Sequence, residues 1–116
     1  MSVTIWHNPR CSKSRETLAL IEARGVTPQI IRYLEEPPSA QAILAAARQL
    51  GLSSVREMIR SKETEYIALN LDNPDLSERA LADALNAAPA LIERPIVFSR
   101  GKAAIGRPPE NVLSIL

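Results

Sequence analysis

This sequence has one cysteine and few aromatic residues, and it lacks a long apolar run. Its basic and acidic side chains are nearly equal in number. The single cysteine, Cys11, cannot form a disulfide within the chain or supply a multi-cysteine zinc site, so thiol chemistry needs a second molecule. The 14 basic and 13 acidic side chains give a net charge of +1, which argues against a polycation that coats nucleic acid. The longest aliphatic run, residues 43–47, is far shorter than the roughly 18 residues of a membrane span. We expect a soluble, cytoplasmic protein that binds no metal, membrane or nucleic acid.

The composition is otherwise that of an ordinary globular domain. Of the 116 residues, 46% are hydrophobic and 23% are charged, which predicts one domain spanning residues 1–116. Eleven of the 14 basic residues are arginine, whose planar guanidinium matches tetrahedral oxyanions. A GC-rich genome would produce the same excess, since alanine is also abundant. The positions of the arginines, rather than their number, therefore decide any argument about binding.

The first third of the chain has the pattern of a strand, a helix and a second strand. Residues 3–6 form a short β-branched and aromatic run. A helical pattern begins at Ser14 and ends near Gly25, where a glycine is typical of a helix C-terminus. Residues 29–34 are again typical of a strand. This order predicts a βαβ unit in which the two strands are parallel.

The rest of the chain is mostly helical until two further strands occur near its end. Residues 39–88 keep a helical periodicity and predict a helical insertion between the second and third strands. Residues 96–98 and 102–105 predict a β-hairpin, and residues 109–116 predict a closing amphipathic helix. The sequence thus favours an α/β fold with a small mixed sheet of about four strands, flanking helices and a helical insertion.

Cys11 lies between the end of the first strand and the start of the first helix. A helix N-terminus carries unpaired N–H groups and partial positive charge, which favours thiolate over thiol and can hold an oxyanion. Arg10, Lys13 and Arg15 add cations nearby. His7, four residues upstream, could assist as an imidazolium ion or as a hydrogen-bond donor. These neighbours favour a nucleophilic cysteine over an inert one packed in a core.

Ser14 stands three residues after Cys11, where a dithiol redox motif would have its second cysteine. The loop therefore keeps the attacking thiol and lacks the resolving one. Any covalent intermediate formed on Cys11 must be cleared by an external thiol.

Three segments together resemble the glutaredoxin-dependent arsenate reductase family, namely residues 7–15, 93–97 and 106–110. They occur in the order and spacing of that family, and the similarity extends over nearly the whole chain. The resemblance implies a thioredoxin-like fold with a helical insertion and a cis peptide bond between Arg94 and Pro95. It also implies a cysteine that attacks arsenate, with glutathione as co-substrate, glutaredoxin as partner and no bound cofactor.

The resemblance also assigns roles to individual residues. Cys11 is the expected nucleophile, and His7 is at the position thought to favour its thiolate. Three arginines outside the loop are expected to bind the oxyanion, with Arg56 as the alternative to the first of them if the alignment shifts. Three loop residues are expected to support the cysteine. The arginines are Arg60, Arg94 and Arg107, and the supporting residues are Asn8, Ser14 and Arg15.

Two other functions stay open on this sequence. The same fold occurs in redox-sensing transcription regulators of the Spx type, which bind RNA polymerase but commonly lack the arginine that matches Arg107. A monothiol reductase that uses glutathione on another substrate would also keep Cys11. Formation of arsenite in the presence of glutathione and glutaredoxin distinguishes an arsenate reductase from both.

Overall fold

The computed structural model describes residues 2–116, which form two compact units. The sheet unit consists of the chain up to Glu36 together with Arg94–Leu116, and the helical unit consists of Pro37–Glu93. The helical insertion expected over residues 39–88 therefore extends a few residues further at both ends and is a compact body of its own. None of the helices within residues 2–116 is long and apolar enough to cross a membrane.

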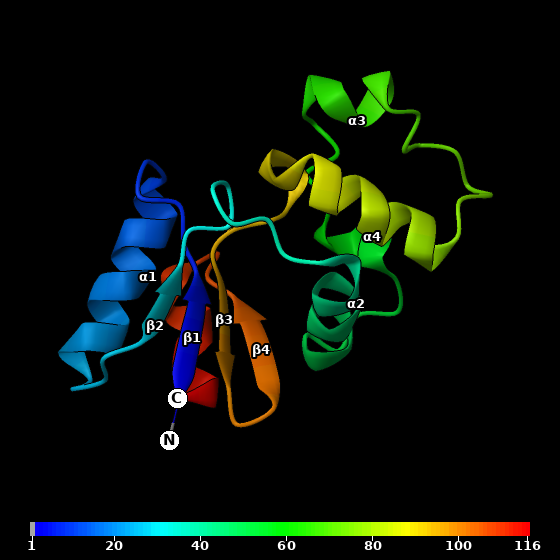
Figure 1. The fold of residues 1–116 in the computed structure, drawn as a ribbon. Coiled ribbons are helices and arrows are strands. Elements are labelled where there is room, and N and C mark those ends of the chain that lie inside the picture. The colour runs from blue at the N-terminus through cyan, green and yellow to red at the C-terminus, as the bar shows by residue number, and fades with distance from the viewer. Residues whose placement is uncertain (1) are drawn as a thin grey trace. The chain divides into compact units, whose positions relative to one another are not determined.

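A four-stranded mixed sheet forms the centre of the sheet unit (Figure 1). Its order is β2-β1-β3-β4, with β1 parallel to β2 and antiparallel to β3. The predicted βαβ unit and the predicted hairpin between β3 and β4 are thus confirmed. The strands are β1 (Val3–Trp6), β2 (Gln29–Ile31), β3 (Ile96–Ser99) and β4 (Lys102–Ile105).

The β3–β4 hairpin closes through a two-residue turn. Arg100 and Gly101 both have positive φ angles, 57° and 76°. That backbone matches the twist of antiparallel strands, and glycine adopts it without steric cost.

Two helices pack on the sheet around one apolar cluster. α1 (Ser12–Ala23) follows β1, and the closing segment η3 (Pro109–Ile115) follows β4. η3 is the predicted closing helix, but it is of the 3-10 type, in which the Asn111 amide donates to the Pro108 carbonyl three residues earlier. The buried members of the cluster are Val3, Ile5, Ile21, Val97 and Val112.

The second strand is shorter than the sequence predicts. It ends at Ile31 rather than Leu34, because the chain turns there and the amides of Glu35 and Glu36 both donate to the carbonyl of Arg32. The last two apolar residues of this stretch belong to the turn, with Tyr33 buried and Leu34 exposed.

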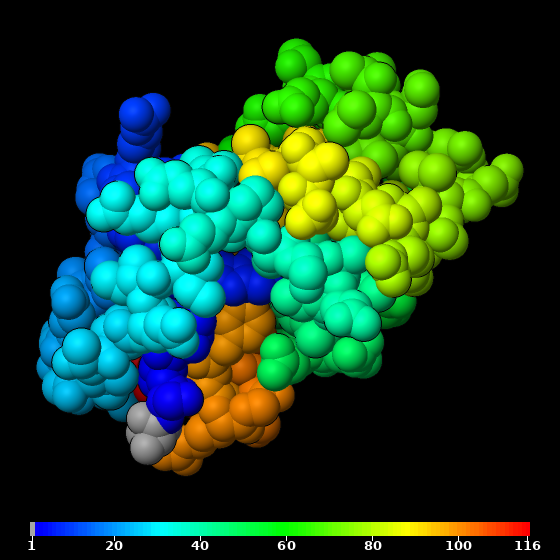
Figure 2. All heavy atoms as spheres, in the orientation of Figure 1, coloured from blue at the N-terminus to red at the C-terminus, as the bar shows by residue number. Residues whose placement is uncertain are grey.

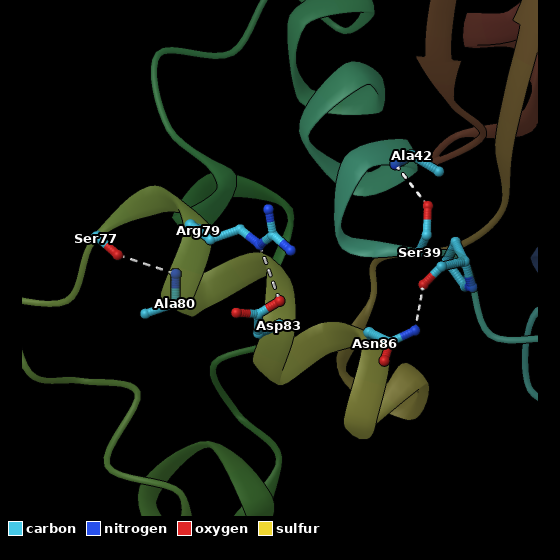
Figure 3. Close-up of polar contacts among 8 residues, drawn as sticks. Ser39, Ala42, Ser77, Arg79, Ala80, Asp83 and Asn86 are labelled. Carbon is cyan, nitrogen blue, oxygen red and sulfur yellow. Dashed lines mark hydrogen bonds and ion pairs between the residues drawn. The ribbon is translucent and has the colours of Figure 1, made fainter.

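The helical unit is built from five short helices, three of which have an N-terminus capped by serine. Ser39 accepts from the Ala42 amide and Ser77 from the Ala80 amide (Figure 3). Ser54 forms a capping box with Glu57. The elements are α2 (Ala40–Gln49), η1 (Val55–Met58), α3 (Thr64–Ala68), α4 (Glu78–Ala87) and η2 (Pro89–Leu91).

Candidate functional site

Cys11 is the N-cap residue of α1, directly after the loop that leaves β1. Its amide donates to the Asn8 carbonyl at 3.0 Å, and its carbonyl accepts from the Arg15 amide at 3.0 Å. Its side chain makes no capping hydrogen bond. The sulfur is therefore held at the start of the helix by the backbone alone and stays available for another partner.

That partner is Arg107, which is 96 residues further along the chain. Its Nη2 lies 3.6 Å from the Cys11 Sγ, within hydrogen-bond distance for a sulfur acceptor. Its Nε donates to the Arg94 carbonyl at 2.8 Å, which fixes the direction of the guanidinium. The Arg107 guanidinium thus places a positive charge directly beside the sulfur.

Arg94 contributes unpaired donors to the same unit. Its Nε and Nη1 are buried and have no hydrogen-bond partner among residues 2–116. Buried N–H groups without a partner are costly, so such a group commonly marks a ligand site. The peptide bond between Arg94 and Pro95 is cis, as the resemblance implies, and the bond between Arg107 and Pro108 is cis as well.

Gly106 brings the arginine-bearing segment close to the cysteine helix. A Cβ at this position would collide with the Thr17 Oγ1 on α1 and lie 2.9 Å from the Pro95 Cγ. The Gly106 amide also donates to the Pro95 carbonyl at 2.9 Å. Only glycine allows this approach, and the approach places Arg107 beside Cys11.

His7 is buried and is held by Ser14 rather than by Cys11. Its Nδ1 lies 2.6 Å from the Ser14 Oγ, which also accepts from the Asn8 amide at 3.0 Å. Burial lowers the pKa of His7 below its usual 6.5, and the nearby Arg32 and Arg15 lower it further. Of the two roles considered from the sequence, the imidazolium ion is therefore disfavoured near neutral pH. The neutral ring instead fixes the loop through Ser14.

The lowered pKa of His7 has a direct consequence for stability. The unfolded chain binds the proton of this histidine near the ordinary pKa of 6.5, whereas the folded chain resists it to lower pH. The contribution of neutral His7 to folding is thus complete above the unfolded pKa and decreases as the pH falls from there through the folded pKa.

The loop before Cys11 is braced by two further contacts. Arg15 donates from Nη1 to the Pro9 carbonyl at 2.9 Å, and the Asn8 Oδ1 accepts from the Arg10 amide at 3.0 Å. The residues expected to support the loop, Asn8, Ser14 and Arg15, therefore all bond to it. Within residues 2–116, no group of three or more His, Cys, Asp or Glu side chains is arranged to hold a metal ion.

The profile of the ArsC family matches residues 6–115. The chain belongs to the ArsC family. A Haemophilus influenzae protein named arsenate reductase is 54% identical over 116 residues, the full length of both chains. The protein YfgD of Escherichia coli K12 is 53% identical over 114 residues, 98% of this chain and 96% of that protein. The solved arsenate reductase of Vibrio cholerae has a TM-score of 0.97 at 56% identity, covering 100% of this chain and 98% of that one.

Of the three arginines that the ArsC-family resemblance singles out, Arg60 belongs to the helical unit. It follows the isolated bridge between Ile59 and Ile92, and its guanidinium pairs with Glu63 at 3.3 Å and Glu93 at 3.5 Å. These pairs hold a single conformation while leaving a quarter of the side chain exposed, 26%. Its role in oxyanion binding stays a prediction.

The alternative arginine, Arg56, is fully engaged within the helical unit. Its Nη1 donates to the Leu71 carbonyl and the Tyr66 hydroxyl, and its Nη2 donates to the Asn73 carbonyl at 2.9 Å. A guanidinium that ties three parts of its own unit together is a structural residue. Arg60 makes only side-chain ion pairs, with Glu63 and Glu93, and donates to no carbonyl of its unit, so it stays the expected anion-binding arginine of the two.

Two residues that shape this ArsC-family site, Gly106 and Arg32, are not among the site residues predicted from the sequence. Gly106 belongs to one of the family-like segments, and a glycine just before Arg107 is itself a signal for close backbone approach. Arg32 was assigned to the second strand, and only the turn after Ile31 reveals that its charge acts on His7. No pattern in the sequence signals that the charge of Arg32 lowers the pKa of His7.

Proposed function

We propose that this protein is an arsenate reductase in which Cys11 is the nucleophile and external thiols supply the electrons. The observation that carries the proposal is the contact between the Arg107 guanidinium and the Cys11 sulfur at 3.6 Å. An ArsC-family chain with its lone cysteine so placed has the two parts that the reaction needs, a nucleophilic sulfur and a cation for the incoming anion.

Electrostatics explains why the cations are required. Arsenate carries one to two negative charges near neutral pH and must approach a sulfur that is itself negative when reactive. Arg107 and the unpaired buried nitrogens of Arg94 offset this repulsion, together with the first-turn amides of α1. Because these donors are positioned before the substrate arrives, little reorganisation is needed in the transition state.

The first step joins sulfur to arsenic without any change of oxidation state. Written with neutral acids, the Cys11 thiol and arsenic acid condense to an adduct with a sulfur–arsenic bond and release one water. The thiol proton leaves with the departing hydroxyl, and arsenic stays in its pentavalent state. Arg107 is placed to act on both partners, since it can hold the sulfur before attack and an arsenate oxygen during attack.

External thiols complete the reduction because no second cysteine exists in the chain. A glutathione thiol replaces one hydroxyl of the adduct and releases water. A second thiol, that of glutaredoxin, attacks the glutathione sulfur and forms a mixed disulfide, and the electron pair of the broken bond between that sulfur and arsenic reduces arsenic to the trivalent state. The glutaredoxin thiol proton passes to the remaining oxo group of arsenic. Hydrolysis of the bond between the Cys11 sulfur and trivalent arsenic then releases arsenous acid and restores the Cys11 thiol.

The decisive experiment measures arsenite formed from arsenate with purified protein, glutathione and glutaredoxin. The wild type should turn over, and Cys11→Ser should not, while its circular dichroism spectrum stays unchanged because the side chain makes no capping bond. Turnover by Cys11→Ser would remove the nucleophile. Absence of arsenite formation by the wild type, with glutathione-dependent reduction of disulfides intact, would replace arsenate by another substrate.

A further inference from the structure

A cavity of about 240 Å³ lies beside the cysteine loop, within the sheet unit. One wall is the loop that leads into Cys11, and the other is the turn that follows β2. This second wall is at the molecular surface (Figure 2), where Arg32, Leu34 and Glu35 are all exposed. The lining residues are His7, Asn8, Pro9, Arg10, Arg32, Leu34 and Glu35.

The charged groups of this cavity are two guanidinium groups and one carboxylate. Arg10 stands next to Cys11 in the sequence, and Arg32 and Glu35 come from the turn. Among the side chains of residues 2–116, none forms an ion pair with any of these three. The cavity thus presents two free positive charges and one free negative charge, whereas other exposed charges, such as Arg79 and Asp83, pair with each other (Figure 3).

His7, which also lines this cavity, gives further evidence that the cavity can bind a ligand. Ser14 occupies the His7 Nδ1, so Nε2 is the ring nitrogen left for a ligand. The charge of Arg32 reaches this ring, because it is one of the causes that lower the pKa of His7. Arg32 therefore lies close to the loop that carries Cys11, although the two residues are 21 positions apart in the sequence.

We propose that this cavity binds the peptide end of glutathione and directs its thiol to the arsenic on Cys11. The inference rests on the proposed function, since it assigns a place to the thiol co-substrate of that reaction. Glutathione carries two carboxylates and one ammonium group, which match the two guanidiniums and the one carboxylate of the cavity. The volume is below the roughly 300–1,000 Å³ of sites that enclose a drug-sized ligand, so part of the tripeptide extends out of the cavity.

The carboxylate of Glu35 distinguishes this ligand from a simple oxyanion. Arsenate or phosphate would meet repulsion from Glu35 and would gain nothing from it. An ammonium group gains a partner there. Among residues 2–116, no carboxylate forms an ion pair with Arg107 or Arg94 at the arsenate position, so the two sites are suited to different parts of one reaction.

The step that this cavity serves is a condensation. The glutathione sulfur bonds to arsenic on Cys11, one hydroxyl leaves with the thiol proton as water, and arsenic stays pentavalent. Asn8 and Arg10 line the cavity, and the Cys11 amide bonds to the Asn8 carbonyl. A ligand held there is therefore within one loop of the reacting atom, and its thiol gains the high effective concentration of a bound partner.

Binding is tested without turnover by titrating isotope-labelled protein with S-methylglutathione, which has no free thiol. We expect amide shifts centred on the cavity residues, weakened about two- to fivefold in affinity by Arg32→Ala and again by Arg10→Ala. Arg24→Ala removes the same charge from the exposed end of α1, outside the cavity, and should bind as the wild type does. Shifts elsewhere, no shifts at millimolar ligand, or equal effects of Arg24→Ala and Arg32→Ala would overturn the inference.

Kinetics with two substrates provide the second test. Arg32→Ala should raise KM for glutathione about two- to fivefold while KM for arsenate stays constant. The glycine ethyl ester of glutathione should be a poorer substrate for the wild type and show a smaller penalty in Arg32→Ala, because the carboxylate and its partner are removed together. An unchanged KM for glutathione in the Arg10→Ala, Arg32→Ala double variant refutes the site. Binding of S-methylglutathione at this cavity without arsenate turnover would instead refute arsenate as the substrate and leave the thiol site supported.

Discussion

Replacing Arg107 by alanine tests the central contact of the site. The substitution removes the Nη2 that lies 3.6 Å from the Cys11 Sγ and the Nε that donates to the Arg94 carbonyl. Arg107 is exposed, and its backbone bonds to Ile105 and Asn111 do not involve the side chain. The variant should therefore fold normally and lose chemistry rather than stability.

The expected loss follows from the kind of hydrogen bond that is removed. A hydrogen bond to a charged group contributes about 1.5–3 kcal/mol. If Arg107 makes one such bond in the transition state for attack on arsenate, kcat/KM for arsenate should fall by about 10- to 150-fold. A loss near the lower end would mean that Arg94 and the helix amides compensate.

The assay is the initial rate of arsenite formation over a range of arsenate concentrations at saturating glutathione and glutaredoxin. Arg107→Lys keeps the charge but loses the planar pair of donors that links the Arg94 carbonyl to the sulfur. It should therefore show an intermediate loss. Arg24→Ala, which removes an equal charge from the end of α1, should leave kcat/KM within a factor of about two.

One result would refute this reasoning directly. If Arg107→Ala retained kcat/KM for arsenate within about twofold of the wild type, the contact with Cys11 would be a feature of the resting protein without a role in the reaction. A large loss in both Arg107→Ala and Arg24→Ala would instead point to the overall charge of the unit.

Three further predictions concern stability and the choice between arginines. Gly106→Ala should reduce the free energy of unfolding by about 1–3 kcal/mol and also lower kcat/KM for arsenate, because the added Cβ displaces the segment that carries Arg107. Gly101→Ala, at a residue with positive φ and open space around it, should reduce the free energy of unfolding by about 1–2 kcal/mol and leave kcat/KM for arsenate unchanged. Equal kcat/KM values for Gly106→Ala and Gly101→Ala would contradict the role given to Gly106. Between about pH 7 and 5.5, the wild type should lose stability in urea unfolding and His7→Gln should lose less, because protonation of His7 opposes folding; parallel curves would disprove this. Arg56→Ala should reduce the free energy of unfolding by about 1–3 kcal/mol and leave kcat/KM for arsenate unchanged. Arg60→Ala should lower kcat/KM for arsenate and leave the free energy of unfolding unchanged, and matching effects of the two variants would show that the two roles are assigned wrongly.

The strands and most helices could be predicted from the sequence because their signals are local. The β-branched run of β1, the serine caps at Ser54 and Ser77, and the Arg100-Gly101 turn each depend on a few neighbouring residues. The errors occurred where distant or competing interactions decide. Residues 32–34 continue the strand-like composition of β2, but the Arg32 carbonyl accepts from the amides of Glu35 and Glu36, so these residues form a turn outside the sheet.

The candidate site was less predictable than the fold. The polar loop around Cys11 indicates a reactive thiol, but it gives no sign that the Nδ1 of His7 bonds to Ser14, and direct assistance of the sulfur by His7 stays a prediction. The sequence alone does not show that the buried ring of His7 contacts Ser14, seven residues further along the chain. Likewise, the contact of Arg107 with Cys11 joins positions 96 residues apart, and only the resemblance to a known family suggested it.

The balance of charge over the chain explains why the site needs its particular arginines. A net charge of +1 provides almost no long-range field to attract arsenate or an anionic thiol. Attraction must then come from a few guanidiniums held close to the sulfur, because the interaction between charges strengthens at short distance. Arg107 and Arg94 have this character on the arsenate side, with one nitrogen on the sulfur and two buried nitrogens left unpaired. By the same principle Arg32 has the corresponding role for glutathione. Raising the salt concentration from about 50 to 500 mM should weaken the binding of glutathione, which only exposed charged groups hold, more than that of arsenate, which also meets the buried nitrogens of Arg94.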